Sequence, residues 1–163
     1  MRWEDIDFQN RIIHIKRNAI YNYNEKQFVV GSTKTVSGLR EIPMTQTTYD
    51  ILASIKKNGE RNIISFKFAD HVFLNSKGKL ITNSDYNKCL NRICKKAGIE
   101  TISMHTLRHT FATRCIESGM KPKTLQKILG HSNISMTMNL YVHVTEDEKE
   151  KEMQQFEQMC RMA

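Results

Sequence analysis

The sequence predicts an α+β fold that is mainly α-helical and carries a small three-stranded antiparallel sheet. Up to residue 44, apolar and polar residues alternate in short segments, which is the period of a half-buried strand. From residue 45 onward, apolar residues recur at helical spacing between capping residues and glycines. The chain has 163 residues, of which 39% are hydrophobic. That length and composition suit one ordinary domain with its own core.

The three strands are expected over residues 11–17, 27–30 and 39–44. Ile13 and Ile15 alternate with polar residues in the first segment, and a polar turn region covers residues 21–26. Pro43 lies at the end of the third strand, where an edge position tolerates a residue that cannot donate to the ladder. Short strands joined by tight turns indicate an antiparallel sheet.

Six helices are expected after the strands, and most of them carry a start or a stop signal. Thr82 with Asp85 resembles a capping box, and Gly98 ends the helix that follows. Pro122 opens a short helix that Gly130 stops. The predicted ranges are 45–58, 82–97, 103–118 (with His105 as an alternative start), 122–129, 135–144 and 146–162.

The charge of the chain indicates a polyanionic partner. Lys and Arg number 25 against 17 Asp and Glu, a net charge of +8. Residues 145–163 are acidic, with six acids and three bases, so the basic excess lies in residues 1–144. Nucleic acid is the default partner for such a surface, although solubility alone is an alternative explanation. No apolar run approaches a membrane span, and the first ten residues do not resemble a secretory signal.

The four cysteines lack the spacing of a zinc site or a redox motif. We expect them to be reduced thiols in a cytosolic protein. They are Cys89, Cys94, Cys115 and Cys160.

Five residues form a set with coherent chemistry. His105 and Arg108 share a helix face, His131 follows Gly in Leu-Gly-His, Tyr141 lies ten residues later, and Lys34 lies in the expected hairpin. Arginine offers a fork of donors to a phosphate, histidine can move a proton, and tyrosine can attack phosphorus. Each residue alone has an ordinary structural explanation, such as a cap or a half-buried aromatic. Their order and spacing favour metal-free phosphodiester transfer.

These motifs resemble the catalytic domain of the tyrosine site-specific recombinases, the phage integrase family. The set His105-Thr-Leu-Arg108-His-Thr-Phe-Ala-Thr, Leu129-Gly-His131 and Tyr141-Val-His143 is similar to integrases of conjugative transposons and prophages. Trp3-Glu-Asp-Ile-Asp7 and Thr33-Lys-Thr-Val-Ser-Gly-Leu-Arg-Glu-Ile-Pro43 also resemble the segments that build the family's small sheet. The resemblance implies a catalytic domain over residues 1–144 that lacks its first helices. Residues 145–163 would be an amphipathic tail helix of the same domain.

The resemblance also implies a mechanism for site-specific DNA recombination and integration. Tyr141 would attack a DNA phosphate, form a 3′-phosphotyrosyl link and release a 5′-hydroxyl. Arg108 would clamp the phosphate, and His131 would donate a hydrogen bond to it. His105 would act as acid or base or orient the tyrosine, and Lys34 would protonate the leaving oxygen. No cofactor, metal or ATP is implied.

The implied partners are double-stranded DNA at attachment or recombination sites and other recombinase protomers in a synaptic complex. Neither a membrane nor a small-molecule substrate is implied, and the expected location is the cytoplasm of a bacterium that carries a phage or mobile element. His109 and His143 are expected to be structural. The tail stripe of Met153, Phe156 and Met159 or Cys160 either docks on a neighbouring protomer or packs within the chain.

One departure from the family lowers the expected activity. The family has an earlier arginine, in a T-G-L-R-x-G-E-L segment before the Trp3 segment, and an N-terminal domain that clamps DNA. Arg2 is adjacent to Trp3 and cannot be that arginine. Losing one preorganised cation at a phosphoryl transition state costs on the order of 10²–10³ in rate. We therefore expect an incomplete catalytic domain, and the alternative is a catalytically inactive DNA-binding fragment.

Other classes of protein fit less well. A basic helical RNA-binding or adaptor protein would require the catalytic pattern to be coincidental. A zinc module lacks ligand spacing. A type IB topoisomerase shares the chemistry, but the motifs are closer to those of integrases.

Overall fold

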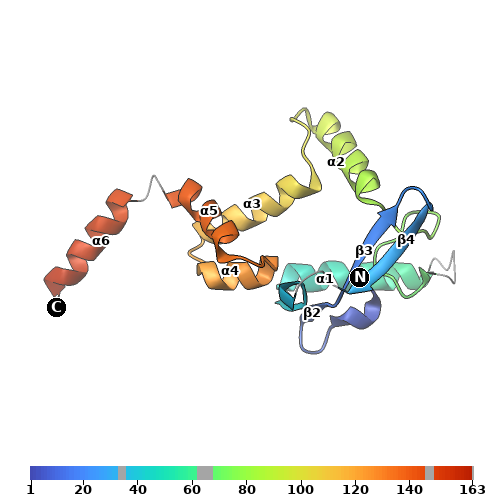
Figure 1. Ribbon diagram of the computed structural model, residues 1–163, viewed down its shortest axis with the longest axis horizontal. Helices are drawn as coiled ribbons and strands as arrows, with labels where there is room; N and C mark the ends of the chain where they lie inside the picture. The colour runs from blue at the N-terminus through green and yellow to red at the C-terminus, as the bar shows by residue number, and fades with distance from the viewer. Residues whose placement is uncertain (33–35, 62–67, 146–148, 163) are drawn as a thin grey trace. The chain divides into compact units, whose positions relative to one another are not determined.

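The computed structural model describes residues 1–32, 36–61, 68–145 and 149–162 (Figure 1). About 54% of the chain is helical, and a small antiparallel sheet accompanies the helices, which confirms the predicted fold class. Packing divides the chain into two compact units, Met1–Met104 and His105–Ala163. A division into a domain at 1–144 and a tail at 145–163 stays a prediction.

The three-stranded sheet of the first unit has the order β1-β2-β5 and is antiparallel throughout. Its strands are β1 (Ile6–Asp7), β2 (Ile12–Ile15) and β5 (Arg40–Pro43). Ile13 in the central strand pairs with Ile6 on one side and Ile42 on the other, which gathers apolar side chains at one place. Pro43 lies on an edge strand, as its lack of an N–H requires.

The membership of this sheet differs from the prediction. The segment expected as its second strand belongs instead to a separate hairpin of β3 (Arg17–Asn22) and β4 (Gln27–Ser32). Asn22 makes the turn, because its side-chain oxygen accepts the N–H groups of Asn24 and Glu25. The strand that completes the sheet in its place is β1. This strand is only two residues long, so it shows no alternation that a sequence pattern could reveal.

The core of the first unit forms where helix α1 (Gln46–Arg61) and the sheet supply apolar side chains. Leu52 of α1 is buried with Ile6 and Ile13 of the sheet. The helix continues through Gly59, where the sequence suggested a stop. Gly59 does not adopt a positive φ, and a glycine in a helix costs about 1 kcal/mol without ending it.

A buried carboxylate holds the N-terminal segment to the hairpin. Asp5 is 1% exposed, accepts the backbone N–H of Arg2 at 2.8 Å and pairs with Arg17 of β3 at 3.1 Å. Arg17 also bonds Glu4 at 2.7 Å, and this contact is the main cause that raises the pKa of Arg17. These contacts offset the cost of burying the Asp5 charge.

Helix α2 (Asn83–Ala97) has the boundaries that its caps predict. Thr82 accepts the N–H of Asp85 at 3.2 Å, and Asp85 accepts the N–H of Thr82 at 3.1 Å. This reciprocal pair is the expected capping box. Gly98 ends the helix at φ 68°, a left-handed conformation that glycine adopts without strain.

The second unit contains α3 (Met104–Glu117) from its second residue onward, together with α4 (Pro122–Leu129), α5 (Ile134–Thr145) and α6 (Lys149–Met162). Pro122 starts α4 and Gly130, at φ 71°, stops it, as predicted. Five buried residues from α3 and α4 form the core, and Leu140 and Tyr141 of α5 pack against it. The buried residues are Ala112, Cys115, Ile116, Leu125 and Leu129.

All four cysteines are free, with Cys94 and Cys115 buried and Cys89 and Cys160 exposed. Over the ranges that the structure describes, no helix is both long enough and apolar enough to cross a membrane.

Candidate active site

Arg108 lies at the C-terminal end of α4 although it belongs to α3. Its Nη2 donates a hydrogen bond of 2.6 Å to the backbone carbonyl of Leu129, the last residue of α4. The last carbonyls of a helix have no intrahelical partner, so a cation there caps the helix and complements its dipole. Burial lowers the pKa of Arg108, but a guanidinium remains charged at neutral pH.

His131 follows the left-handed Gly130 and therefore lies at the same end of α4. The carbonyl of Gln126 accepts the N–H of Gly130 at 2.9 Å and that of His131 at 3.2 Å. The side-chain Nε2 of Gln126 donates to the carbonyl of His131 at 3.1 Å. The imidazole Nδ1 lies 3.0 Å from the hydroxyl of Thr137 on α5. The predicted phosphate ligands Arg108 and His131 thus flank a single helix end.

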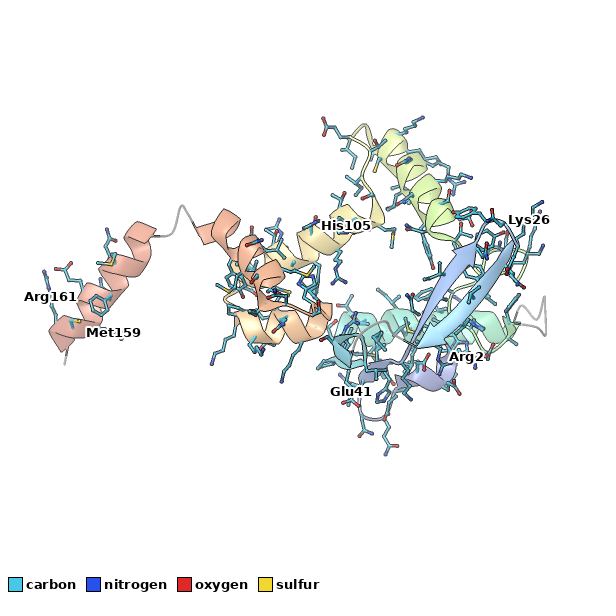
Figure 2. All side chains as sticks on the ribbon, in the orientation of Figure 1. Arg2, Lys26, Glu41, His105, Met159 and Arg161 are labelled. Carbon is cyan, nitrogen blue, oxygen red and sulfur yellow. The ribbon has the colours of Figure 1, made fainter. Side chains whose placement is uncertain are left out.

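His105 lies one turn before Arg108 on α3 and is exposed. Figure 2 labels its side chain at the start of that helix. Its Nε2 is 2.8 Å from the Nε2 of His109, and the two rings are nearly perpendicular, at 88°. Such a bond needs a proton on one Nε2 and none on the other. His109, which the sequence suggested to be structural, therefore contacts a candidate acid or base directly.

Tyr141 is half-buried on α5 and packs against the core of its unit. Its hydroxyl donates a hydrogen bond to the backbone carbonyl of Met120, which precedes α4. Burial is the main cause that raises the pKa of the phenol, and the charge that Cys115 can carry adds to it. The phenol therefore keeps its proton at neutral pH and needs an acceptor for that proton before it can attack.

The structure separates the tyrosine hydroxyl from the two predicted phosphate ligands. Met120 precedes α4 and Leu129 ends it, and α4 has eight residues. Eight helical residues span about 12 Å, so the hydroxyl of Tyr141 lies roughly one helix length from the carbonyl that holds Arg108. Lys34, the remaining predicted residue, falls outside the described residues.

Sequence patterns missed three of the groups that shape this site. They are the amide of Gln126, the hydroxyl of Thr137 and the carbonyl of Met120. Thr137 carried one signal, because it lies four residues before Tyr141 and so shares its helix face. A backbone carbonyl carries no signal in a sequence. In the part of the chain that the structure describes, no group of three or more His, Cys, Asp or Glu could hold a metal ion.

A second basic feature lies on α2, in the first unit. Four exposed cations of this helix line a shallow groove together with Asn91. They are Lys88, Arg92, Lys95 and Lys96. A row of cations on one helix suits the regular phosphates of a nucleic acid backbone.

Comparison with known proteins identifies the fold and the family. Residues 1–148 match the model of the phage integrase family. The transposase of transposon Tn916 from Enterococcus faecalis is 37% identical over 158 residues, which cover 91% of this chain and 38% of the relative. Tyrosine recombinase XerD of Listeria monocytogenes is 39% identical over 108 residues, 65% of this chain and 36% of the relative. The chain thus spans less than half the length of these curated relatives.

Solved structures agree with this assignment. The Tn1549 transposon integrase in complex with a circular intermediate DNA matches 96% of this chain and 52% of its own, with a TM-score of 0.80 and 36% identity. The same integrase with transposon right end DNA has a TM-score of 0.81 and 35% identity, over 95% of this chain and 52% of its own. The motifs, the fold and the match over residues 1–148 together show that the chain belongs to the phage integrase family, as part of a tyrosine recombinase catalytic domain.

Proposed function

We propose that this chain carries the strand-cleaving and strand-joining site of a site-specific DNA recombinase, with Tyr141 as the nucleophile. The observation that carries the proposal is the placement of Arg108 and His131 at one end of α4. A fork of charged donors and an imidazole at the same helix end fit a phosphate on which negative charge grows. The similarity to the Tn916 transposase and to XerD supports the same conclusion.

In the proposed reaction, the Tyr141 oxygen attacks phosphorus and the bond from phosphorus to the 5′-oxygen breaks. The products are a 3′-phosphotyrosyl link and a free 5′-hydroxyl. Arg108 and His131 bind the non-bridging oxygens. His105 accepts the phenol proton or orients the tyrosine, and Lys34 supplies a proton to the leaving oxygen. A second 5′-hydroxyl then attacks the phosphotyrosyl link, which retains the energy of the original bond, so that ATP is not consumed.

Double-stranded DNA is the proposed partner. The basic groove on α2 would bind the backbone, and we expect each lost phosphate contact to reduce the salt dependence of binding. Strand exchange joins two duplexes, so other recombinase protomers are further expected partners. A bacterial cytoplasm is the proposed location, because bacterial DNA and the mobile elements of the relatives reside there.

A covalent trap tests the reaction. The chain is incubated with a pool of nicked duplexes from which a short 5′-hydroxyl fragment diffuses away after cleavage, so that the protein stays attached. An adduct that resists SDS is expected for the wild type and for Tyr86→Phe, the matched control at another half-buried tyrosine. Tyr141→Phe should form none. An adduct of undiminished yield in Tyr141→Phe would refute the assignment of the nucleophile.

A second candidate function is DNA binding without cleavage. The contact between the Tyr141 hydroxyl and the carbonyl of Met120 favours it, because the hydroxyl is engaged away from Arg108. This candidate predicts duplex binding that weakens steeply with salt, and no adduct with any nicked duplex. The trap and a binding titration over a range of salt concentrations therefore distinguish the two functions.

A further inference from the structure

We infer that Thr137 is a positioning residue that keeps the ring proton of neutral His131 on Nε2, so that this nitrogen donates a hydrogen bond to the phosphate. The inference concerns a residue to which neither the motifs nor the relatives assign a role. The role of Thr137 in phosphate binding rests on the proposed function. The position of the ring proton of His131 follows from the contacts of Thr137 alone.

The hydroxyl of Thr137 is isolated from solvent and lies against the imidazole. Thr137 is 0% exposed, and its Oγ1 is 3.0 Å from Nδ1 of His131. Within the described residues, this nitrogen is the one hydrogen-bonding partner that the structure gives to the Thr137 hydroxyl. Thr110 on α3 shows the usual alternative for a helical threonine, because its hydroxyl donates to the carbonyl of Thr106 at 3.0 Å.

The direction of this hydrogen bond follows from counting protons. A hydroxyl carries one proton, and a buried hydroxyl that cannot donate it loses stability. If Nδ1 of His131 were protonated, Thr137 would have to accept, and its own proton would have no acceptor among the described residues. Thr137 therefore donates to Nδ1. A neutral imidazole has one ring proton, so that proton must be on Nε2.

The backbone of His131 is held in place as well. Gln126 accepts the N–H of His131 through its carbonyl and donates to the carbonyl of His131 through its side chain. With both backbone groups engaged, only the side-chain torsions remain to orient the ring. The Thr137 contact fixes them by holding Nδ1 toward α5. A phosphate at the end of α4 would then meet Nε2.

Nε2 of His131 can therefore donate a hydrogen bond to the phosphate regardless of the charge of the ring. In the Nε2–H form, His131 donates to a phosphate oxygen whether the ring is neutral or protonated. In the other neutral form, Nε2 has a lone pair and would repel that oxygen. Thr137 therefore removes a competing form of the ring in which the phosphate contact fails.

Nitrogen NMR tests the proton directly. The full chain is labelled with ¹⁵N in its histidines, and two-bond proton–nitrogen correlations report which ring nitrogen is protonated. His131→Gln assigns the resonances of His131. At a pH where the ring is neutral, we expect a protonated Nε2 and an unprotonated Nδ1 in the wild type and in Thr137→Ser. Thr137→Val should show a mixture of the two forms, and Thr110→Val, the matched control, should resemble the wild type.

The covalent trap provides the functional readout. Thr137→Val should slow adduct formation by about 10- to 100-fold, by analogy with the groups that orient metal-ligating histidines, and Thr137→Ser should restore it. A wild-type His131 with its proton on Nδ1 overturns the inference, and this result does not depend on whether Thr137→Val folds. An unchanged adduct rate in folded Thr137→Val overturns the positioning role. Failure of the wild type to form any adduct refutes the proposed function, while the NMR result for His131 still stands.

Discussion

Replacing Arg108 with alanine should loosen the C-terminal end of α4 in addition to removing the proposed phosphate ligand. The guanidinium donates at 2.6 Å to the carbonyl of Leu129, a residue only 5% exposed. Water reaches that carbonyl poorly, so the lost bond is not readily replaced. A hydrogen bond to a charged group contributes about 1.5–3 kcal/mol. Since 1.36 kcal/mol corresponds to a factor of ten, local opening should become about 10- to 150-fold more frequent.

Hydrogen exchange followed by mass spectrometry measures this opening where it occurs. Peptides that cover residues 121–131 should exchange faster in Arg108→Ala, whereas peptides that cover β2 in the other compact unit serve as the internal reference. Arg114→Ala is the matched control. Arg114 is on the same helix, but its side chain is 77% exposed and its pair with Glu117 is worth at most about 1 kcal/mol.

Arg108→Lys separates the two roles of the arginine. Lysine keeps the charge but lacks the planar fork, so it should protect α4 partly while adduct formation still falls by about 10²–10³. Exchange in residues 121–131 that is equal in Arg108→Ala, Arg114→Ala and the wild type would refute the reasoning, because it would show that Arg108 does not cap α4 in solution.

Three further predictions follow from burial and charge. Leu125→Ala should destabilise the second unit by about 2–5 kcal/mol in urea unfolding, because Leu125 is 0% exposed in its core. Burial raises the pKa of the Tyr141 phenol, so the stability linked to its proton should be present below the unfolded pKa and lost as the pH rises through the folded pKa. Alkaline titration of phenol absorbance in the wild type and Tyr141→Phe measures the pKa of Tyr141. Tyr86, whose pKa burial also raises, remains in both proteins. Replacing Lys95 and Lys96 with glutamine should reduce the slope of log affinity against log salt by about 2 for duplex DNA if both bind phosphates.

Local signals explain why the helices could be predicted closely. The Thr82–Asp85 capping box, Gly98, Pro122 and Gly130 each act within a few residues of a helix end, and each was confirmed. The pairing of strands is different, because it joins residues that are distant in the sequence. β2 pairs with β5 across the whole β3–β4 hairpin, and no pattern within residues 27–30 indicates which partner that segment takes.

The same distinction applies to the candidate site. Spacing on one helix predicted that His105 and Arg108 share a face, and the Leu-Gly-His turn was predicted from Gly130. The contacts from Arg108 to Leu129 and from Tyr141 to Met120 each join residues 21 apart. Tertiary packing alone brings such residues together, so the sequence could predict side chains for the candidate site but not the backbone carbonyls that hold two of them.

These two carbonyls lie at opposite ends of α4, and this limits how the proposed reaction can proceed. The eight residues of α4 span about 12 Å, so the Tyr141 hydroxyl must leave Met120 before it can attack a phosphate bound by Arg108. The hydrogen bond that it breaks is worth about 0.5–1.5 kcal/mol net. Such a difference changes a population by about 2- to 13-fold. Tyr141 also packs against the core of its unit, so binding of DNA at the α4 end must favour the released tyrosine by at least that amount, while Arg108 and His131 remain in place.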